Sequence, residues 1–400
     1  MSDRRDGVGG PLGFLAEGFE RELKRLGYKP GAASAQLGLL ADLSRWLEDE
    51  GIPAAALTGG RVVDFLAARR REGRARFVSP TGMATLLGYL RGAGVVPEAL
   101  RPAPVGPTEA LLECYHRFLV DDRGLAPAVV VQYETGARLF AEFVGQRGTN
   151  LAEVSASDVS AFVAEHCARP VKLAPAEMAT ILRAFLRFLY GEGITRSPLH
   201  NAVPPVASWK ASTLPKALPQ GAVACLLHSC DRRTARGRRD YAILMLLARL
   251  GLRAGEIVAL GLDDFDWRAG ELVIHGKGRR EERMPLPEDV GEAVVGYLRR
   301  GRPRSDCRAV FVRTVAPLVG LTRGAVTNVV YAACDRAGVV RASAHRLRHT
   351  LATDLLREGS SLTEIGQVLR HVSISTTSIY AKVDHDALSE LARPWPGGEA

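Results

Sequence analysis

Several features of membrane and exported proteins are missing from this 400-residue sequence. No apolar run approaches the roughly 20 residues that a transmembrane helix needs. The first ten residues, MSDRRDGVGG, contain no apolar core like that of a secretory signal. With 46% hydrophobic residues the chain can build globular cores. We therefore expect a cytoplasmic, globular protein of two or three domains.

Patterned cysteines are also absent. The six cysteines are scattered and form no CxxC pair, which predicts reduced thiols that serve packing. Cys225, His228 and Cys230 lie close together, but tetrahedral zinc needs a fourth ligand and none is evident nearby. We expect neither a metal nor another cofactor.

Acidic residues are fewer than basic residues in this sequence. Lysine and arginine number 53 against 44 aspartates and glutamates, which gives a net charge of +9 at pH 7. Such an excess favours a polyanionic partner, of which nucleic acid is the commonest. Charge alone does not establish that partner, so local motifs have to support it.

Two proline-rich passages, at residues 101–107 and 201–219, have the composition of extended linkers. They predict three parts: an N-terminal helical module at 1–105, a second helical module at 108–205, and a third domain at 214–395.

The first two parts look like copies of one plan. At an offset of 97 residues, GYKPGAASAQLGLLADLSRWL falls on GLAPAVVVQYETGARLFAEFV and VVDFLA on VSAFVA; at an offset of 95, PTGMATLL falls on PAEMATIL. Apolar residues recur at helical spacing in every piece, so each copy predicts about four amphipathic helices. Two such modules suit a protein that grips successive stretches of a long ligand, although two purely structural bundles would give the same pattern.

The third part predicts mainly helices with one β-hairpin. RRDYAILMLLARLGLRAGEIVAL is a helix, a break at Gly251 and a second helix. ELVIHGKGRREERMPLP alternates, turns and resumes, as a hairpin does. SLTE at 361–364 has the form of a capping box, and SISTTSIYAKV offers a further hydroxyl-capped helix start. The expected fold class is mainly α with a small β-hairpin or sheet (α+β).

The run AHRLRHTLAT concentrates charge on one helix face, because His345, Arg348 and His349 are three and four residues apart. The HxxxH spacing can hold a metal, but Arg346 stands where a metalloprotease has its glutamate and would repel a cation. An anion site fits better, since arginine holds phosphate oxygens in bidentate geometry. His349 is expected to be a packed core histidine satisfied by backbone.

Four other residues are candidates that carry little weight singly. Arg253 follows the break at Gly251 and would otherwise be a solvated charge that Glu256 orients. Lys277 is at the hairpin tip, His371 at a helix end, and Tyr380 in a helix where a core role is the ordinary one.

Together, the sequence motifs around these residues closely resemble those of the tyrosine recombinase (phage integrase) family. The resemblance rests on LGLRAGE, GKGRREERMPL, HRLRHTLAT and LRHVSISTTSIYAKV, covers roughly residues 215–390, and extends less specifically over 109–205 to that family's core-binding helical (SAM-like) domain. It implies a site-specific DNA recombinase or integrase that cuts and rejoins duplex DNA through a 3′-phosphotyrosyl intermediate. The implied catalytic residues are Arg253, Lys277, His345, Arg348, His371 and the nucleophile Tyr380.

The chemistry gives each implied residue a role. Arg253 and Arg348 clamp the non-bridging oxygens, because charge develops there in the transition state. Tyrosine has an ordinary pKa near 10, so its hydroxyl needs cations or a base, and His345 is the candidate for that proton. Lys277 is the general acid for the leaving 5′ oxygen and His371 a phosphate contact. No ATP and no metal are needed.

The resemblance also implies a tetramer on double-stranded DNA, since strand exchange joins two sites and four protomers. The extra module at 1–105 suggests transposition by a mobile element, with other recombinases of that element as possible partners. One departure concerns Arg370, which stands where the family often has a glycine. After Tyr380, the segment DHDALSELARPW is expected either to dock on a neighbouring protomer or to fold back.

Two other classes stay open. LDDFDW offers Asp263, Asp264 and Asp266 to a metal-dependent nuclease or transposase. A catalytically silent DNA-binding or architectural protein on the same fold would not need Tyr380. A related tyrosine-type topoisomerase would share the chemistry.

Overall fold

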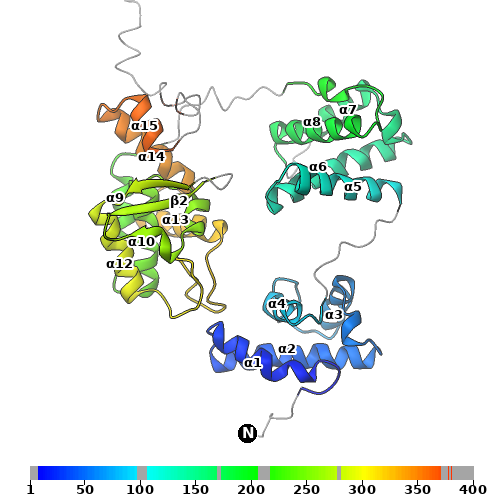
Figure 1. The fold of residues 1–400 in the computed structure, drawn as a ribbon, viewed down its shortest axis with the longest axis horizontal. Coiled ribbons are helices and arrows are strands. Elements are labelled where there is room, and N and C mark those ends of the chain that lie inside the picture. Colours follow the sequence, from blue (N-terminus) through cyan, green and yellow to red (C-terminus); the bar gives the residue numbers. More distant parts are fainter. Residues whose placement is uncertain are drawn as a thin grey trace, which may run out of the picture. The chain divides into compact units, whose positions relative to one another are not determined.

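The computed structural model describes residues 8–96, 106–168, 173–205, 217–276 and 281–370, together with Thr377 and Tyr380 (Figure 1). The chain is mostly helical, at 63% helix, with one small antiparallel sheet, which confirms the predicted fold class. None of the helices described is long and apolar enough to cross a membrane.

The first module is a four-helix bundle around its own core, in which Phe19, Leu43, Phe65 and Leu86 are buried. Its main helix begins at Pro30, a favourable first position because proline lacks the N–H that a helix start leaves unpaired. Thr58 caps the next long helix by accepting a hydrogen bond from the N–H of Arg61. The helices are α1 (Ala16–Arg25), α2 (Pro30–Asp49), α3 (Gly59–Arg71) and α4 (Ala84–Gly92).

The second module repeats that order around a separate core rich in phenylalanine. Its helices are α5 (Pro107–Arg117), α6 (Pro127–Gln146), α7 (Ala156–Ala168) and α8 (Pro175–Gly191). Both ends of α6 and of α7 lie 97 residues after those of α2 and α3, which supports the internal repeat seen in the sequence. Met178 of α8 is buried as its counterpart Met83 is, although α4 begins one turn later.

The third module has a small sheet and a helical core (Figure 1). Helix α10 is buried along most of its length because α9, α12, α13 and α14 pack around it. The helices are α9 (Ala222–His228), α10 (Ala235–Arg249), α11 (Ala254–Ala259), α12 (Glu288–Arg300), α13 (Arg323–Ala337), α14 (Ala344–Arg357) and α15 (Leu362–Val368).

The predicted hairpin is confirmed as strands β2 (Glu271–His275) and β3 (Glu281–Pro285), with β1 (Phe265–Asp266) added on the far edge of β2. Leu272 and Ile274 are buried, as alternation along a half-covered strand requires. The tip that carries Lys277 lies outside the described residues.

The other local expectations for this module also hold. The break between α10 and α11 occurs at Gly251, whose φ of +59° is a conformation that glycine adopts without a steric penalty. Ser361 and Glu364 form the predicted capping box, in which the Ser361 N–H donates to the Glu364 carboxylate at 2.8 Å. The hydroxyl-capped segment before Tyr380 lies largely outside the described residues, and so does the C-terminal segment after it.

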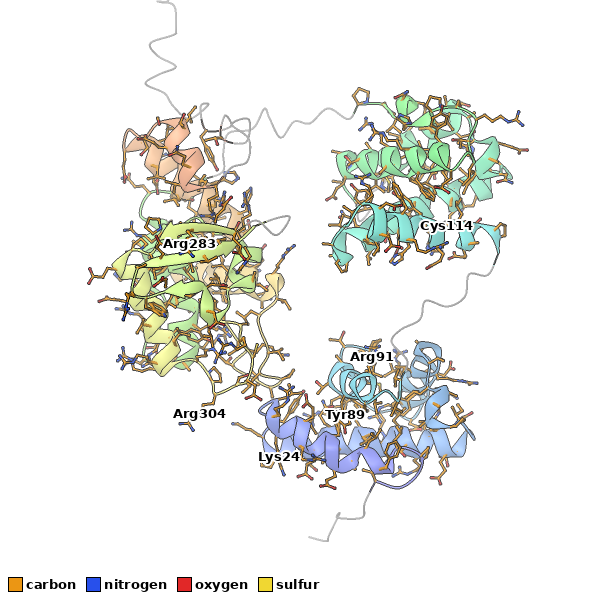
Figure 2. The ribbon with its side chains drawn as sticks, in the orientation of Figure 1. Lys24, Tyr89, Arg91, Cys114, Arg283 and Arg304 are labelled. Atoms are coloured by element: carbon orange, nitrogen blue, oxygen red, sulfur yellow. The ribbon has the colours of Figure 1, made fainter. Side chains whose placement is uncertain are left out.

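By internal contacts the chain divides into two compact units, Leu100–Thr213 and the remainder. The three-part division stays a prediction. Side chains fill the core of each module (Figure 2). The cysteines whose side chains are described are free thiols: Cys114, Cys225, Cys230, Cys307 and Cys334. His228 directs Nδ1 to the carbonyl of Ala224 at 2.7 Å, a backbone contact rather than part of a metal cluster.

Candidate active site

The first turns of α14 bring together the residues of the AHRLRHTLAT motif. The rings of His345 and His349 pack edge to face with their centroids 4.3 Å apart, as four-residue spacing on a helix predicts. Arg348 lies between them in sequence and is only 1% exposed. The predicted shared face is therefore confirmed.

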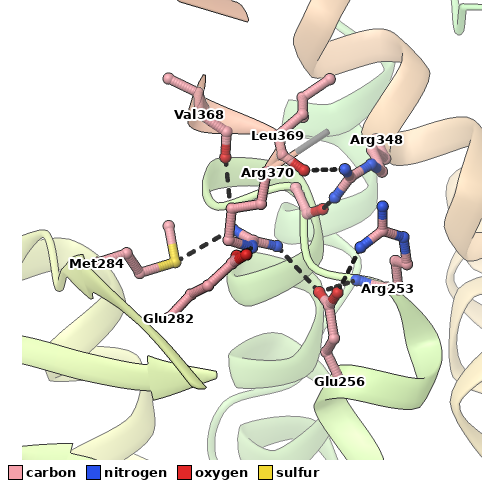
Figure 3. Close-up of polar contacts among 9 residues, drawn as sticks. Arg253, Glu256, Glu282, Met284, Arg348, Val368, Leu369 and Arg370 are labelled. Carbon is pink, nitrogen blue, oxygen red and sulfur yellow. Dashed lines mark hydrogen bonds and ion pairs between the residues drawn. The ribbon is translucent and has the colours of Figure 1, made fainter. Parts of the chain in front are cut away.

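Arg348 is held by backbone. Its Nη1 donates to the carbonyl of Gly251 and its Nη2 to the carbonyl of Leu369 (Figure 3). Burial, followed by the charges of Arg253 and Arg370, lowers the pKa of Arg348 to about 10, so the guanidinium is still charged at neutral pH. These bonds use two of the five N–H donors of an arginine.

Arg253 is the residue before the first turn of α11 and is bound by the acid that the sequence suggested. Its Nη1 donates to Glu256 Oε1 at 2.7 Å and its backbone N–H to Oε2 at 2.9 Å. The Arg253 side chain is 48% exposed, so the oriented guanidinium still faces solvent. This geometry confirms that Glu256 orients Arg253.

Arg370 joins the same carboxylate from a second side (Figure 3). Its Nη2 donates to Glu256 Oε2 at 2.9 Å, and its side chain is 8% exposed. The sequence marked Arg370 as a departure from the family but gave no sign of this contact, because Glu256 lies 114 residues earlier.

Tyr380 packs in a small cluster with Ala352, Ile365 and Leu369, and its hydroxyl lies 2.8 Å from His349 Nδ1. The expectation that His349 is satisfied by backbone was wrong, since the partner of its Nδ1 is this phenol. The signal was present in the sequence: His349 is one turn beyond His345 on the same face.

Burial sets the protonation of this pair. It raises the pKa of Tyr380 to about 12, against the opposing charge of Arg348. Burial, then His345 and Arg348, lower the pKa of His349 to about 4. Burial, followed by the charges of Arg348 and Arg253, also lowers the pKa of His345. At neutral pH a protonated phenol therefore faces the neutral imidazole of His349, against which the neutral imidazole of His345 packs.

The structure thus brings four of the six candidate residues into one electrostatic cluster: Arg253, His345, Arg348 and Tyr380. Lys277 and His371 lie outside the described residues, Lys277 two residues after β2 ends and His371 next to Arg370. Chemically, the cluster combines guanidinium groups, which suit an anion, with a phenol hydroxyl beside neutral imidazoles.

The acidic alternative is not favoured. Asp263 binds Arg308, Asp264 accepts from His275 Nε2 at 2.9 Å, and Asp266 accepts the backbone N–H groups of its own turn. The three carboxylates are thus engaged separately, whereas a two-metal site needs them to converge. Within the described residues no three acidic, histidine or cysteine side chains form a group able to hold a metal.

Comparison with known proteins matches both later parts of the chain. The phage integrase family matches residues 216–386, and the phage integrase N-terminal SAM-like domain matches residues 112–193. A Sinorhizobium fredii protein named as an integrase/recombinase (y4rA) is 38% identical across 97% of this chain and 95% of its own length. Tyrosine recombinase XerD of Listeria monocytogenes is 32% identical across 70% of this chain and 96% of its own.

The fold is also similar to that of a solved recombinase structure. The crystal structure of XerH site-specific recombinase bound to palindromic difH substrate, a post-cleavage complex, covers 84% of this chain and 95% of that one with a TM-score of 0.58. At 18% identity this likeness concerns the fold alone. The sequence relatives, matched over nearly their full length, decide the family. The chain belongs to the phage integrase (tyrosine recombinase) family and is therefore a site-specific recombinase that breaks and rejoins DNA.

Proposed function

We propose that this chain recombines duplex DNA through a covalent link between Tyr380 and a 3′ phosphate, with Arg253, Lys277, His345, Arg348 and His371 as its other catalytic residues. The observation that carries the proposal is the hydrogen bond of the Tyr380 hydroxyl to a histidine of α14, the helix that also presents Arg348 and His345.

In the proposed cleavage step Tyr380 Oη attacks the phosphorus, the bond from phosphorus to the 5′ oxygen breaks, and Lys277 gives that oxygen a proton. Arg253 and Arg348 bind the non-bridging oxygens, on which negative charge develops, and His371 contacts one of them. The phosphotyrosyl bond conserves the energy of the broken bond. Attack by a 5′ hydroxyl of another strand reverses the step and restores Tyr380.

We assign the tyrosine proton to His345, with His349 holding the hydroxyl before DNA binds. Both imidazoles have lowered pKa values and are neutral at pH 7, as a proton acceptor must be. The buried phenol, with its pKa raised to about 12, is a poor nucleophile where it lies. Tyr380 therefore has to leave His349 to reach the phosphate.

The proposed partners are double-stranded DNA and three further copies of the chain. XerH, which shares the fold, was solved on its DNA substrate. A net charge of +9 suits such a partner. Transposition of a mobile element, alongside its other recombinases, and action in the cytoplasm complete the proposal.

The test uses DNA from the ends of the element that encodes the chain, nicked near each candidate site to trap the intermediate. Wild-type protein and Tyr380→Phe are incubated with it in EDTA, and SDS-resistant adducts are resolved on a gel. An adduct with wild type only supports the phosphotyrosyl route. Cleavage that needs Mg²⁺, or an adduct with Tyr380→Phe, would contradict it. DNA binding without any adduct at any end would favour the catalytically silent alternative.

A further inference from the structure

Arg370 occupies a backbone position that suits glycine. Its φ is +53°, in the left-handed region that residues with a side chain rarely adopt. It directly follows Leu369, the C-cap residue of α15, and directly precedes His371. An arginine kept in this conformation needs a compensating contribution from its side chain.

The Arg370 guanidinium connects three segments that are distant in sequence (Figure 3). Nη2 donates to Glu256 Oε2 in α11 at 2.9 Å, and Nη1 to Met284 Sδ in β3 at 3.3 Å. Nη1 also lies 3.4 Å from the carbonyl of Val368 in α15, and Nε lies 3.7 Å from the carboxylate of Glu282 in β3. The side chain is 8% exposed, so protein atoms surround most of it.

Glu256 is the point where this connection meets the active site. One of its oxygens receives Arg253 Nη1, and the other receives the Arg253 backbone N–H and Arg370 Nη2. A single buried carboxylate thus fixes two guanidinium groups. If Arg370 were removed, the Glu256 side chain would lose the contact that holds it from the side of β3.

We propose that Arg370 is a positioning residue: by binding Glu256 and β3 together, it fixes the direction of the Arg253 guanidinium relative to β3. The inference rests on the roles proposed above for these residues. In this proposal Arg370 acts through Glu256 and Arg253 and does not itself contact the phosphate.

The charge of Arg370 also keeps Glu256 ionised. Burial opposes ionisation, but the Arg253 backbone N–H and the charges of Arg370 and Arg253 outweigh it and hold the pKa of Glu256 below its ordinary value. The charged groups that act on this carboxylate are Arg253, Arg370 and Arg348, and Glu282 lies on the far side of Arg370. Without Arg370 the pKa of Glu256 should rise, and its protonation would release Arg253.

The test compares wild type with Arg370→Gly and Arg370→Lys, using single-turnover cleavage of the nicked substrate between pH 5 and 8. Arg370→Gly removes the side chain and suits the backbone, so it is expected to fold and to bind DNA within twofold of wild type. Its cleavage rate should fall at least tenfold at pH 7.5 and decline further as the pH falls. Arg370→Lys keeps the positive charge but lacks the two-pronged guanidinium. Its cleavage rate should therefore fall, but without the additional decline at low pH.

Arg249→Ala is the matched control, since it removes one charge from an exposed arginine that pairs with Asp289 outside this network. It should cleave like wild type. If Arg370→Gly and Arg370→Lys both match wild type at every pH, the inference is overturned while the phosphotyrosyl route stands. If wild type forms no adduct through Tyr380, it is the proposed function that fails. An equal loss at all pH values in both variants would reduce Arg370 to a structural residue and overturn its link to Glu256.

Discussion

Arg348 combines deep burial with a positive charge, and proteins bury a charge only when it is well paired. Its bonds to the carbonyls of Gly251 and Leu369 join the α10–α11 break to the end of α15. Under the proposed mechanism, catalysis and local stability therefore depend on the same guanidinium.

Replacing Arg348 with alanine should abolish the SDS-resistant adduct, a loss of at least a hundredfold, while DNA affinity changes only a fewfold. Two buried carbonyls would lose their donor, so the free energy of unfolding should drop by about 2 to 4 kcal/mol. Gel assays and urea unfolding measure the two effects. Arg357→Ala, an exposed arginine in the last turn of α14, is the control. Adduct formation by Arg348→Ala would rule out the proposed phosphate clamp.

His349 should make the third module sensitive to acid. Its pKa is about 4 in the folded chain against 6.5 ordinarily, so the unfolded state binds the proton first. The stabilisation is complete above about pH 6.5 and is lost as the pH falls towards 4. Between pH 7 and 4 wild type should lose about 2 kcal/mol more than His349→Phe, which cannot titrate. Urea unfolding followed through Trp267 measures it, and equal pH dependence would contradict the assignment.

The sequence predicted which of the described candidate residues lie together better than it predicted their contacts. The spacing of His345, Arg348 and His349 fixes a shared helix face, because three- and four-residue separations do so in any helix. The bond of His349 to Tyr380 and that of Arg370 to Glu256 each depend on how separate elements pack. No local spacing encodes such contacts.

At the scale of elements, the break at Gly251 is packed closely against side chains of other elements. A Cβ there would lie 2.8 Å from Leu369 and 3.1 Å from Leu351, in addition to the strain of a positive φ. Gly270 has a similar φ of +66° but no heavy atom within 4 Å of such a Cβ. The two positions therefore separate backbone strain from crowding.

Gly270→Ala should cost about 1 kcal/mol, the penalty of a left-handed alanine. Gly251→Ala should cost about 2 to 4 kcal/mol, because crowding of Leu369 adds to that strain. It should also slow cleavage, since the Gly251 carbonyl holds Arg348. Urea unfolding and adduct formation measure both, and equal destabilisation by the two variants would contradict the packing argument.

Elements with strong local signals were predictable, among them the hairpin, the Gly251 break and the Ser361 capping box. Strand β1 was not, because two residues, Phe265 and Asp266, join the sheet only through pairing with Leu272 and Glu271. Local propensity says little about so short a segment.

At the scale of the molecule, DNA affinity should depend steeply on salt, because phosphate contacts release counterions. A site with six to ten phosphate contacts should lose roughly a thousandfold or more in affinity between 50 and 200 mM salt. Fluorescence anisotropy with a labelled duplex measures the slope of log affinity against log salt. A slope near zero would contradict a phosphate-dominated interface.

The three large hydrophobic clusters of the described residues are separate, one inside the Leu100–Thr213 unit and two in the other unit. We therefore expect each core to unfold cooperatively by itself, and the chain as a whole to depart from two-state unfolding. A calorimetric scan should resolve more than one heat-absorption peak. The third module can then unfold while the second module stays folded. A melting temperature measured on this protein therefore describes only the module whose unfolding the probe detects.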